Sequence, residues 1–274
     1  MTERGRAGRW LELLSYGPVR TVFHTPSVLC SEVKVGKRTA LGLAIVPDAE
    51  ALMPRARHGE MGLEQAWALS AYLRSWLDEQ RRLGLRSPVL AIVDTPGQAF
   101  GRLEEQLCIS AACASAVDAY VAAHEAGHPL LTLVVGRAIS GSFLAHGLQG
   151  DRILALDVDD VLMHAMSEQS IARITRRTVD EVREASSKVA PMSYSIAEAY
   201  RLGIVHKLIE CGNAEQPTAV DVATVRTELD SALASIDDGY VPSLTGNPLR
   251  EATLTVERRL REEWKASERW AHAG

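Results

Sequence analysis

The chain is poor in several residue types, and each scarcity excludes a class of protein. Its four cysteines include no C-x-x-C pair, which argues against a disulfide scaffold or a cysteine-based zinc site. No stretch approaches the ~20 apolar residues of a membrane span. The Arg-rich N-terminus lacks the apolar run of a signal peptide. We therefore expect a cytoplasmic protein with reduced, buried thiols at Cys30, Cys108, Cys113 and Cys211.

A strong excess of charge of either sign is also missing. The 30 Lys and Arg residues nearly balance the 35 Asp and Glu residues, which leaves a net charge of −5 and a pI near 5.9. Such a mild balance predicts attraction neither to nucleic acid nor to a membrane surface. With 46% hydrophobic and 24% charged residues, the composition is that of a soluble globular protein with material for a large core.

The signatures of a zinc protease and of a serine hydrolase are incomplete. Residues 124–128 read HEAGH, but zinc binding needs both histidines on one face of a helix that continues. Gly127 and the proline at position 129 predict that the helix ends here, so no metal site is expected. Ala138 stands where the first glycine of G-x-S-x-G would be, which leaves a nucleophilic Ser140 as an alternative only.

Apolar runs and helical periodicity alternate along the rest of the chain. The expected strands are 19–28, 39–47, 89–93, 130–135, 152–156, 161–163 and 204–209. The expected helices are 10–14, 63–83, 103–126, 141–148, 168–185, 195–202, 220–236 and 248–270. Because the crossovers are too short for a uniform Rossmann sheet, we expect an α/β fold whose strand–turn–helix units stack in a spiral.

One strand runs into the glycine turn DTPGQAFG, at residues 94–101. Pro96 restricts Thr95 to an extended conformation, and Gly97 permits a positive φ. The turn is therefore expected to expose the N–H groups of Gly97 and Gln98. An ordinary strand-to-loop turn explains this motif equally well.

A second strand runs into GRAISGSFLAHG, at residues 136–147. Gly141 lies where the strand passes into a helix, and Ser140 is the expected N-cap. Taken alone, this motif also fits an ordinary helix cap. Two such turns one crossover apart point two sets of backbone N–H groups into one cleft. Such donors suit a thioester oxygen that gains negative charge, so Gly97, Gln98, Ser140 and Gly141 are the predicted catalytic residues, acting mainly through main-chain N–H groups.

Three further side chains are candidates for binding the substrate. His58 lies in a basic loop, Arg137 lies within the second turn motif, and His164 follows an apolar run from which it can enter the cleft as a proton donor. A solvated loop for His58 and a hydrogen-bonded core position for His164 remain open alternatives. The arginines at 173, 176 and 177 are either a solvated helix face or a docking site for an acidic carrier or subunit.

The order of these motifs resembles a known family. DTPG followed by G-x-x-x-S-G-x-x-x-A-x-G is similar to the carboxyltransferase branch of the crotonase superfamily, over residues 45–209. Within that branch, the combination of PRARHGE, DTPGQAFGRLEE, AVDAYVAAHEAGHP and GRAISGSFLAHG looks most like the gamma subunit of biotin-independent malonate decarboxylase. The resemblance implies a crotonase-like (ClpP/crotonase) spiral of ββα units, with a carboxyltransferase-type domain at 1–210 and a C-terminal helical extension at 211–274.

The resemblance also implies an activity and its partners. With a homologous beta subunit, such a chain converts a malonyl-carrier thioester to an acetyl-carrier thioester and CO₂. The implied partners are that beta subunit, an acyl carrier protein and an acyl-carrier transferase. The chain itself binds no cofactor, because the CoA-derived phosphopantetheine-type group belongs to the carrier. Two alternatives remain: a biotin-dependent carboxyltransferase alpha-type subunit, and a non-catalytic partner that completes its sister subunit's cleft.

One departure bears on these alternatives. Related carboxyltransferases place more glycines where this chain has Ala138, Ile139 and Ser142, which predicts a narrower pocket without room for biotin.

The last helix, 248–270, carries an apolar stripe that needs a covering surface. We expect this stripe to pack on the partner subunit, with folding back on the same chain as the alternative. Its apolar residues are Leu249, Leu254, Val256, Leu260 and Trp264.

Overall fold

The computed structural model describes residues 4–238 and 251–271, and the side chains described in the second segment are those of 251 and 254–265. Within these residues, eight strands form one mixed sheet in the order β1-β2-β3-β4-β5-β6-β8, and β7 pairs with β5. The first three strands pair antiparallel and the remaining pairings are parallel. The strands are β1 Arg20–Val22, β2 Thr25–Val35, β3 Arg38–Ile45, β4 Val89–Thr95, β5 Leu130–Ile139, β6 Arg152–Asp157, β7 Leu162–His164 and β8 Lys207–Glu210.

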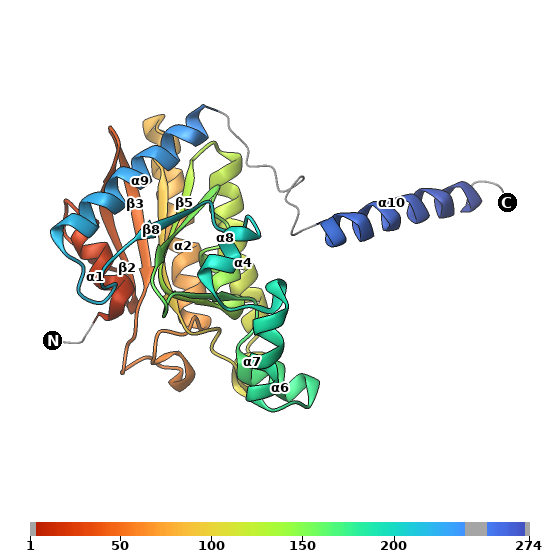
Figure 1. Cartoon of the computed structure of the whole chain (residues 1–274). Helices are drawn as coiled ribbons and strands as arrows, with labels where there is room; N and C mark the ends of the chain where they lie inside the picture. The colour runs from red at the N-terminus through yellow and green to blue at the C-terminus, as the bar shows by residue number, and fades with distance from the viewer. Residues whose placement is uncertain (1–3, 239–250, 272–274) are drawn as a thin grey trace.

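Helices cover both faces of this sheet (Figure 1). On one face, α2 (Leu63–Leu83) packs against α4 (Ile109–Glu125), and their apolar sides share a core cluster with β2 and β3. On the other face, α1 (Gly5–Leu14) and α9 (Ala219–Asp237) pack over the strands. The central strands are buried on both faces, which explains why β4 and β5 read as continuous apolar runs.

The shorter helices follow the strand ends. They are α3 (Arg102–Gln106), α5 (Ser140–His146), α6 (Glu168–Thr175), α7 (Val179–Lys188) and α8 (Ile196–Arg201), with 3₁₀ turns at Pro54–Ala56 and Ala190–Met192. Helix α2 begins and ends at the predicted residues, and Gly84 closes it with a φ of 65°. Ser167 and Thr178 cap the N-termini of α6 and α7 with their hydroxyl groups.

Three elements predicted as continuous are each divided into two in the structure. The strand predicted at 19–28 turns at Phe23, so the chain forms β1 and the much longer β2. The helix predicted at 103–126 breaks at Cys108 into α3 and α4, and the helix predicted at 168–185 breaks at Arg176 into α6 and α7. All three residues have a φ between 50° and 60°, a left-handed conformation that non-glycine residues rarely adopt.

The cysteines follow the prediction only in part. All four thiols are free, and Cys30 and Cys113 are buried. Cys108 is exposed, because its left-handed break lies on the surface between α3 and α4, and Cys211 is half-buried. Where burial occurs, it raises the pKa of the Cys113 thiol and keeps it protonated.

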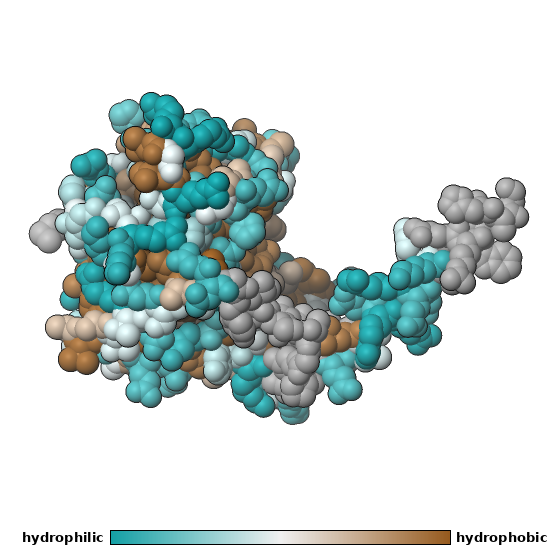
Figure 2. All heavy atoms as spheres, turned by 90° about the horizontal axis from the view of Figure 1, so that it is seen from above, coloured by the Kyte–Doolittle hydropathy of each residue, from teal (hydrophilic) through white to brown (hydrophobic). Residues whose placement is uncertain are grey.

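The C-terminal region contains two different helices. Helix α9 is part of the body, with Val225, Leu229 and Leu233 buried. Helix α10 (Glu251–Ala271) lies apart from the body in Figure 1, and its visible face in Figure 2 is largely hydrophilic. Its side chains at 256, 260 and 264 are 58–68% exposed. Leu249 and the start of the predicted helix lie outside the described residues, and the packing of this helix on a partner stays a prediction.

Candidate active site

The two glycine turns meet at one edge of the sheet. Strands β4 and β5 are parallel neighbours in which Thr95 pairs with Ala138, so both strands end at the same edge. The first turn, residues 96–98, follows β4, and the second turn, residues 139–142, follows β5. A Cβ built on Gly97 would lie 3.7 Å from the Cβ of Ser140, which is ordinary van der Waals contact. The structure therefore brings together the four residues predicted to be catalytic.

A neighbouring loop holds the first turn in place. The Met61 amide donates to the Gly97 carbonyl at 3.1 Å, and the Ala99 amide donates to the Met61 carbonyl at 2.9 Å. These two bonds form a parallel bridge between Met61 and Gln98. Because the bonded groups belong to Gly97 and Ala99, the N–H of Gln98 points away from Met61. Gly97 has a φ of +151°, which agrees with the positive φ predicted for this glycine. The backbone of the turn is thus fixed, with the Gln98 N–H outside the bridge.

The second turn is built differently. Ser140 is the first residue of α5 and has a φ of +63°, so the predicted N-cap role is wrong: Ile139 is the capping residue and contributes no side-chain bond. The Ser142 hydroxyl instead donates to the Ile139 carbonyl at 2.8 Å. The first N–H groups of a helix have no partner within it, so those of Gly141 and Ser142 remain available to the cleft. The described residues give Ser140 no histidine or carboxylate partner, which argues against a nucleophilic role.

Close approach explains two of the three glycines of the second motif, Gly136 and Gly141. A Cβ on Gly141 would lie 3.2 Å from Cδ of Gln98 and nearer still to its Oε1, so the two turns touch through the Gln98 side chain. A Cβ on Gly136 would collide with the Asp94 carboxylate. Asp94 accepts a hydrogen bond from the Arg137 amide at 2.9 Å, which ties the end of β4 to β5. Asp94 was missed in the sequence, where its place before Thr95 gave no sign of this cross-strand bond.

His164 lies on the other side of the second turn. Strand β7 pairs with β5 so that His164 is opposite Ile139. The imidazole stacks on Tyr194 at a centroid distance of 4.2 Å, and its Nδ1 lies 2.8 Å from the Met166 carbonyl. Burial lowers the pKa of His164, so the ring is neutral at pH 7. The second turn is therefore flanked by the first turn on one side and by the backbone of His164 on the other.

The other two substrate-binding candidates lie farther out. The loop that carries His58 packs on the first turn, since a Cβ on Gly59 would lie 3.7 Å from Pro96. The His58 side chain is nevertheless 81% exposed. Arg137 is half exposed, and its Nε is 4.0 Å from the Asp94 carboxylate. Neither side chain is fixed by the protein in the cleft.

A buried pair of side chains, Tyr120 and His146, joins α4 to α5, the helix that begins at the second turn. The Tyr120 hydroxyl of α4 lies 2.9 Å from Nδ1 of His146 in α5. Burial lowers the pKa of His146 to about 4, so this imidazole is neutral. The expected structural role of His146 agrees with this arrangement. Its partner, Tyr120, was not identified from sequence because α4 and α5 meet only in the folded chain.

The HEAGH segment forms the predicted helix C-terminus. Helix α4 ends at Glu125, and Gly127 has a φ of +82°. The two histidines then take different partners: Nδ1 of His124 lies 2.9 Å from the Asp151 carboxylate, and Nδ1 of His128 lies 2.8 Å from the Ser87 carbonyl. Over residues 4–238 and 251–271, no group of three His, Cys, Asp or Glu side chains is placed to hold a metal ion.

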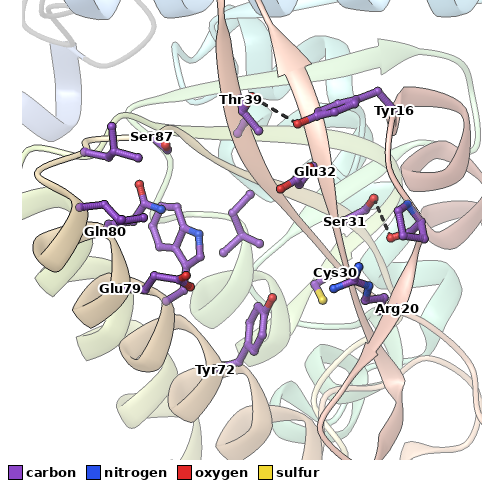
Figure 3. A pocket seen from close by; sticks show the side chains of 16 residues that line it. Tyr16, Arg20, Cys30, Ser31, Glu32, Thr39, Tyr72, Glu79, Gln80 and Ser87 are labelled. Atoms are coloured by element: carbon purple, nitrogen blue, oxygen red, sulfur yellow. Dashed lines mark hydrogen bonds between the residues drawn. The ribbon is translucent and has the colours of Figure 1, made fainter.

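A cavity of about 500 Å³ lies at the other end of the sheet, between α2 and the β2–β3 hairpin. Figure 3 shows Tyr72, Glu79 and Gln80 facing it from α2, and Cys30 and Glu32 facing it from β2. Its walls are side chains, whereas the turns after β4 and β5 offer backbone donors. This cavity therefore lies away from the four residues predicted to be catalytic, which are all at the opposite end of β4 and β5.

The fold places the chain in a structural class. It resembles the transcarboxylase 12S structure solved with methylmalonyl-coenzyme A and methylmalonic acid, with a TM-score of 0.60 at 19% identity over 83% of this chain and 40% of that one. This likeness concerns the fold alone, and it confirms the predicted crotonase-like α/β architecture. No described helix has both the length and the apolar character needed to cross a membrane.

Closer relatives define the family. Two structures of Pseudomonas malonate decarboxylase match: a hetero-tetramer in complex with coenzyme A (TM-score 0.86, 40% identity, 95% of this chain and 99% of that one) and an MdcD-MdcE hetero-dimer (TM-score 0.82, 39% identity, 94% and 99%). The family model of the malonate decarboxylase gamma subunit, MdcE, matches residues 56–264. The chain belongs to the malonate decarboxylase gamma subunit family, as its motifs predicted.

A curated relative has a different name. The Malonomonas rubra malonyl-S-ACP:biotin-protein carboxyltransferase MADD is 35% identical over 172 residues. The match covers 61% of this chain and 59% of that protein, so the chain spans less than two thirds of its length. Proteins similar to this chain are thus found both under a decarboxylase and under a carboxyltransferase name.

Proposed function

We propose that this chain, paired with a homologous beta subunit, decarboxylates a malonyl thioester carried by an acyl carrier protein to the acetyl thioester and CO₂. The observation that carries the proposal is the contact between two donor-bearing turns at one edge of the sheet, in a chain of the malonate decarboxylase gamma subunit family. A decarboxylase needs such donors because negative charge moves onto the thioester oxygen as CO₂ leaves.

The proposed reaction breaks one carbon–carbon bond. The bond between the α-carbon and the free carboxylate breaks, and its electron pair becomes the enolate of the acetyl thioester. Main-chain N–H groups of Gly97, Gln98, Ser140 and Gly141 are the proposed donors to the charged oxygens. Removing one such donor in other enzymes costs about 3–4 kcal/mol of transition-state stabilisation. A proton must then reach the α-carbon, and His164 is the titratable side chain placed beside the second turn.

We propose a beta-subunit partner over the turns. Large apolar side chains surround this edge with 38–61% of their surface exposed: Phe100, Leu103, Leu107, Leu144 and Leu148. Exposed apolar groups gathered around a polar cleft are typical of a protein interface. The Pseudomonas enzyme forms an MdcD-MdcE hetero-dimer, which supports a homologous partner on this surface.

The carrier is the proposed source of the CoA-derived arm. The Pseudomonas hetero-tetramer was solved with coenzyme A, and the Malonomonas relative is named for malonyl-S-ACP. A phosphopantetheine-type arm on an acyl carrier protein, loaded by an acyl-carrier transferase, fits both names. In this proposal the chain holds no resident cofactor, and His58 and Arg137 remain candidates for contacts with the arm or the substrate.

A biotin-dependent carboxyltransferase is the second candidate, because the Malonomonas relative carries that name. The Gln98 side chain against Gly141 supports the decarboxylase instead, since it narrows the space over the second turn. A non-catalytic role, in which this chain only completes its sister's cleft, is the remaining alternative.

One experiment separates the three. The chain and its co-expressed partner are incubated, separately and together, with malonyl-carrier thioester in the presence and absence of avidin. The proposal expects CO₂ release only from the pair, and no effect of avidin. Turnover that avidin abolishes would favour the biotin reaction, and a partner that is fully active alone would end the catalytic assignment.

The C-terminal helix offers a test of the partner surface. Truncation after Asn247 removes α10 and its exposed apolar stripe, which contributes several kcal/mol if a partner buries it, at roughly 25 cal/mol per Å². We expect weaker co-purification with the beta subunit and little change in the melting temperature of the isolated chain. Unchanged co-purification with a large fall in melting temperature would support folding back on the same chain.

A further inference from the structure

The Gln98 side chain lies at the junction of the two turns. Its carboxamide rests against Gly141, with Cδ 3.2 Å and Cβ 3.6 Å from the position that a Gly141 Cβ would take. The residue is half-buried, and the Met61 bridge fixes its backbone. Because the oxygen end of the carboxamide faces Gly141, the two N–H bonds at the other end face away from α5. No described residue accepts a hydrogen bond from them.

A half-buried carboxamide without a protein acceptor is free to donate to an acceptor that a ligand brings. A malonyl thioester has two kinds of acceptor: the thioester oxygen, which gains charge, and the free carboxylate, which loses it as CO₂. Backbone N–H groups of both turns already suit the first. The side-chain N–H groups of Gln98 are an additional pair of donors in the same cleft, and they suit the second.

A neutral donor is the better partner for a carboxylate that must leave. A guanidinium would form charge-assisted hydrogen bonds that are roughly twice as strong and that stabilise the substrate ground state. Stabilisation of the ground state alone opposes the loss of CO₂. The nearby cation, Arg137, is half exposed and leans toward Asp94 at 4.0 Å. A carboxamide also holds the carboxylate, but its weaker hydrogen bonds oppose the loss of CO₂ less.

We propose that the Gln98 carboxamide recognises the free carboxylate of the substrate and makes this cleft specific for dicarboxylic acyl thioesters. The proposal rests on the proposed function and adds a side-chain role to a residue whose main-chain N–H serves the enolate. The interaction exists in the ground state and disappears with CO₂. Its loss should therefore raise KM without lowering kcat.

Two assays on the complex of this chain and its partner test the idea. The first measures KM and kcat for decarboxylation of malonyl-carrier thioester. The second measures exchange of the methyl protons of acetyl-carrier thioester in D₂O, which needs the enolate but has no carboxylate to bind. The variants are Gln98→Ala, Gln98→Glu and the control Gln216→Ala, which changes an exposed glutamine in the segment before α9.

We expect Gln98→Ala to raise the KM for malonyl thioester by about tenfold to a hundredfold, the value of a lost hydrogen bond to a charged group. Gln98→Glu should raise it further, because two carboxylates then face each other. The alanine variant should lose far less activity in exchange into acetyl thioester than in kcat/KM for decarboxylation, since the Gln98 N–H of the backbone remains and acetyl thioester has no carboxylate to bind. Gln216→Ala should behave as wild type in both assays.

Two outcomes would overturn the proposal. An unchanged KM in Gln98→Ala would mean that the side chain does not touch the carboxylate. An equal fall of kcat and of exchange would mean that it acts on the enolate or on the shape of the turn. Absence of decarboxylation by the wild-type complex would overturn the proposed function as well, and the wild-type measurement alone reveals that case.

Discussion

The two turns that carry the predicted catalytic residues are held in their conformations by different interactions. The first is a glycine turn without helix, held from outside by the backbone bridge to Met61 and shaped by Gly97, whose φ of +151° suits glycine. The second starts a helix with Ser140 in a left-handed conformation, and it needs Gly141 for space, since the Gln98 side chain occupies the place of a Cβ. Gly97 is therefore required for its backbone conformation, whereas Gly141 is required because there is no room for a side chain.

A substitution at Gly97 would strain the backbone, whereas a substitution at Gly141 would produce a steric collision. At Gly97 a Cβ has room, because its nearest neighbour would be 3.7 Å away, but the backbone conformation would be costly. At Gly141 no positive φ is involved, yet a Cβ would collide with Gln98. Damage to the first turn should therefore depend on backbone freedom, and damage to the second on the size of its neighbours.

The largest effect is expected at Gly141. Gly141→Val places a branched side chain where the Gln98 carboxamide lies, which blocks the cleft and displaces the N-terminal end of α5. Turnover should fall by about 10²–10³-fold, the cost of losing an oxyanion donor, while the circular dichroism spectrum is retained. Gly141→Ala should recover part of kcat when Gln98→Ala is added, because the collision is then removed. Near-normal kcat in a folded Gly141→Val variant would reject the assignment.

A smaller loss is expected at Gly97. Gly97→Ala meets no collision, but a φ of +151° in a non-glycine residue costs about 1–3 kcal/mol. The turn should relax and move its N–H groups, with kcat lowered about tenfold and the free energy of unfolding lowered by the stated amount. Added Gln98→Ala should give no recovery here, in contrast to Gly141. Recovery by the same second change would show that crowding governs both turns.

Acid should weaken the second turn. His146 under α5 is kept neutral by burial, with its pKa near 4 against an unfolded value of 6.5. The unfolded chain therefore binds the proton first, and stability that is present above pH 6.5 is lost as pH falls toward 4, by about 2 kcal/mol at pH 5. Urea unfolding at pH 7 and pH 5 measures this.

Two variants isolate that contribution. His146→Gln cannot titrate and should show a smaller loss between the two pH values than wild type. His58→Gln changes an exposed histidine of the loop at the first turn and should keep the wild-type slope. Equal slopes in all three proteins would mean that His146 contributes nothing to the acid sensitivity.

The smallest effect is expected from metal removal. In the proposed mechanism both turns act through backbone N–H groups, and the histidines of HEAGH have separate partners in Asp151 and Ser87. Treatment of the active complex with a strong chelator should leave CO₂ release unchanged. Stoichiometric zinc in the purified complex, together with lost activity after its removal, would contradict this expectation.

Most of the fold and the two glycine turns were predictable from sequence, whereas the catalytic role of the turns stays a prediction. Helix α2 was predicted residue for residue, because Gly84 supplies a left-handed end and the apolar spacing is regular. The two turns were found because glycine and proline after apolar strands are local signals. His164 was found as a residue following a strand, whereas its place beside Ile139 depends on the pairing of β7 with β5.

The errors share one physical origin. Phe23, Cys108, Ser140 and Arg176 all have a positive φ, and each marks a place where a predicted strand, helix or cap was wrong. Side chains of these types give no local sign of a left-handed backbone, since the conformation is unfavourable in isolation and is imposed by tertiary packing. Glycine at such positions would have been recognised.

Most of the elements, the two glycine turns and the family were readable in the amino-acid sequence, because periodicity, glycine and proline act within a few residues. Four contacts became known from the folded chain: the turns touch, Gln98 lies against Gly141, Asp94 accepts from the Arg137 amide and Tyr120 meets His146. These contacts join strands and helices far apart in the chain. They depend on the register of β4, β5 and β7, which hydrogen bonding and burial fix together across the whole sheet.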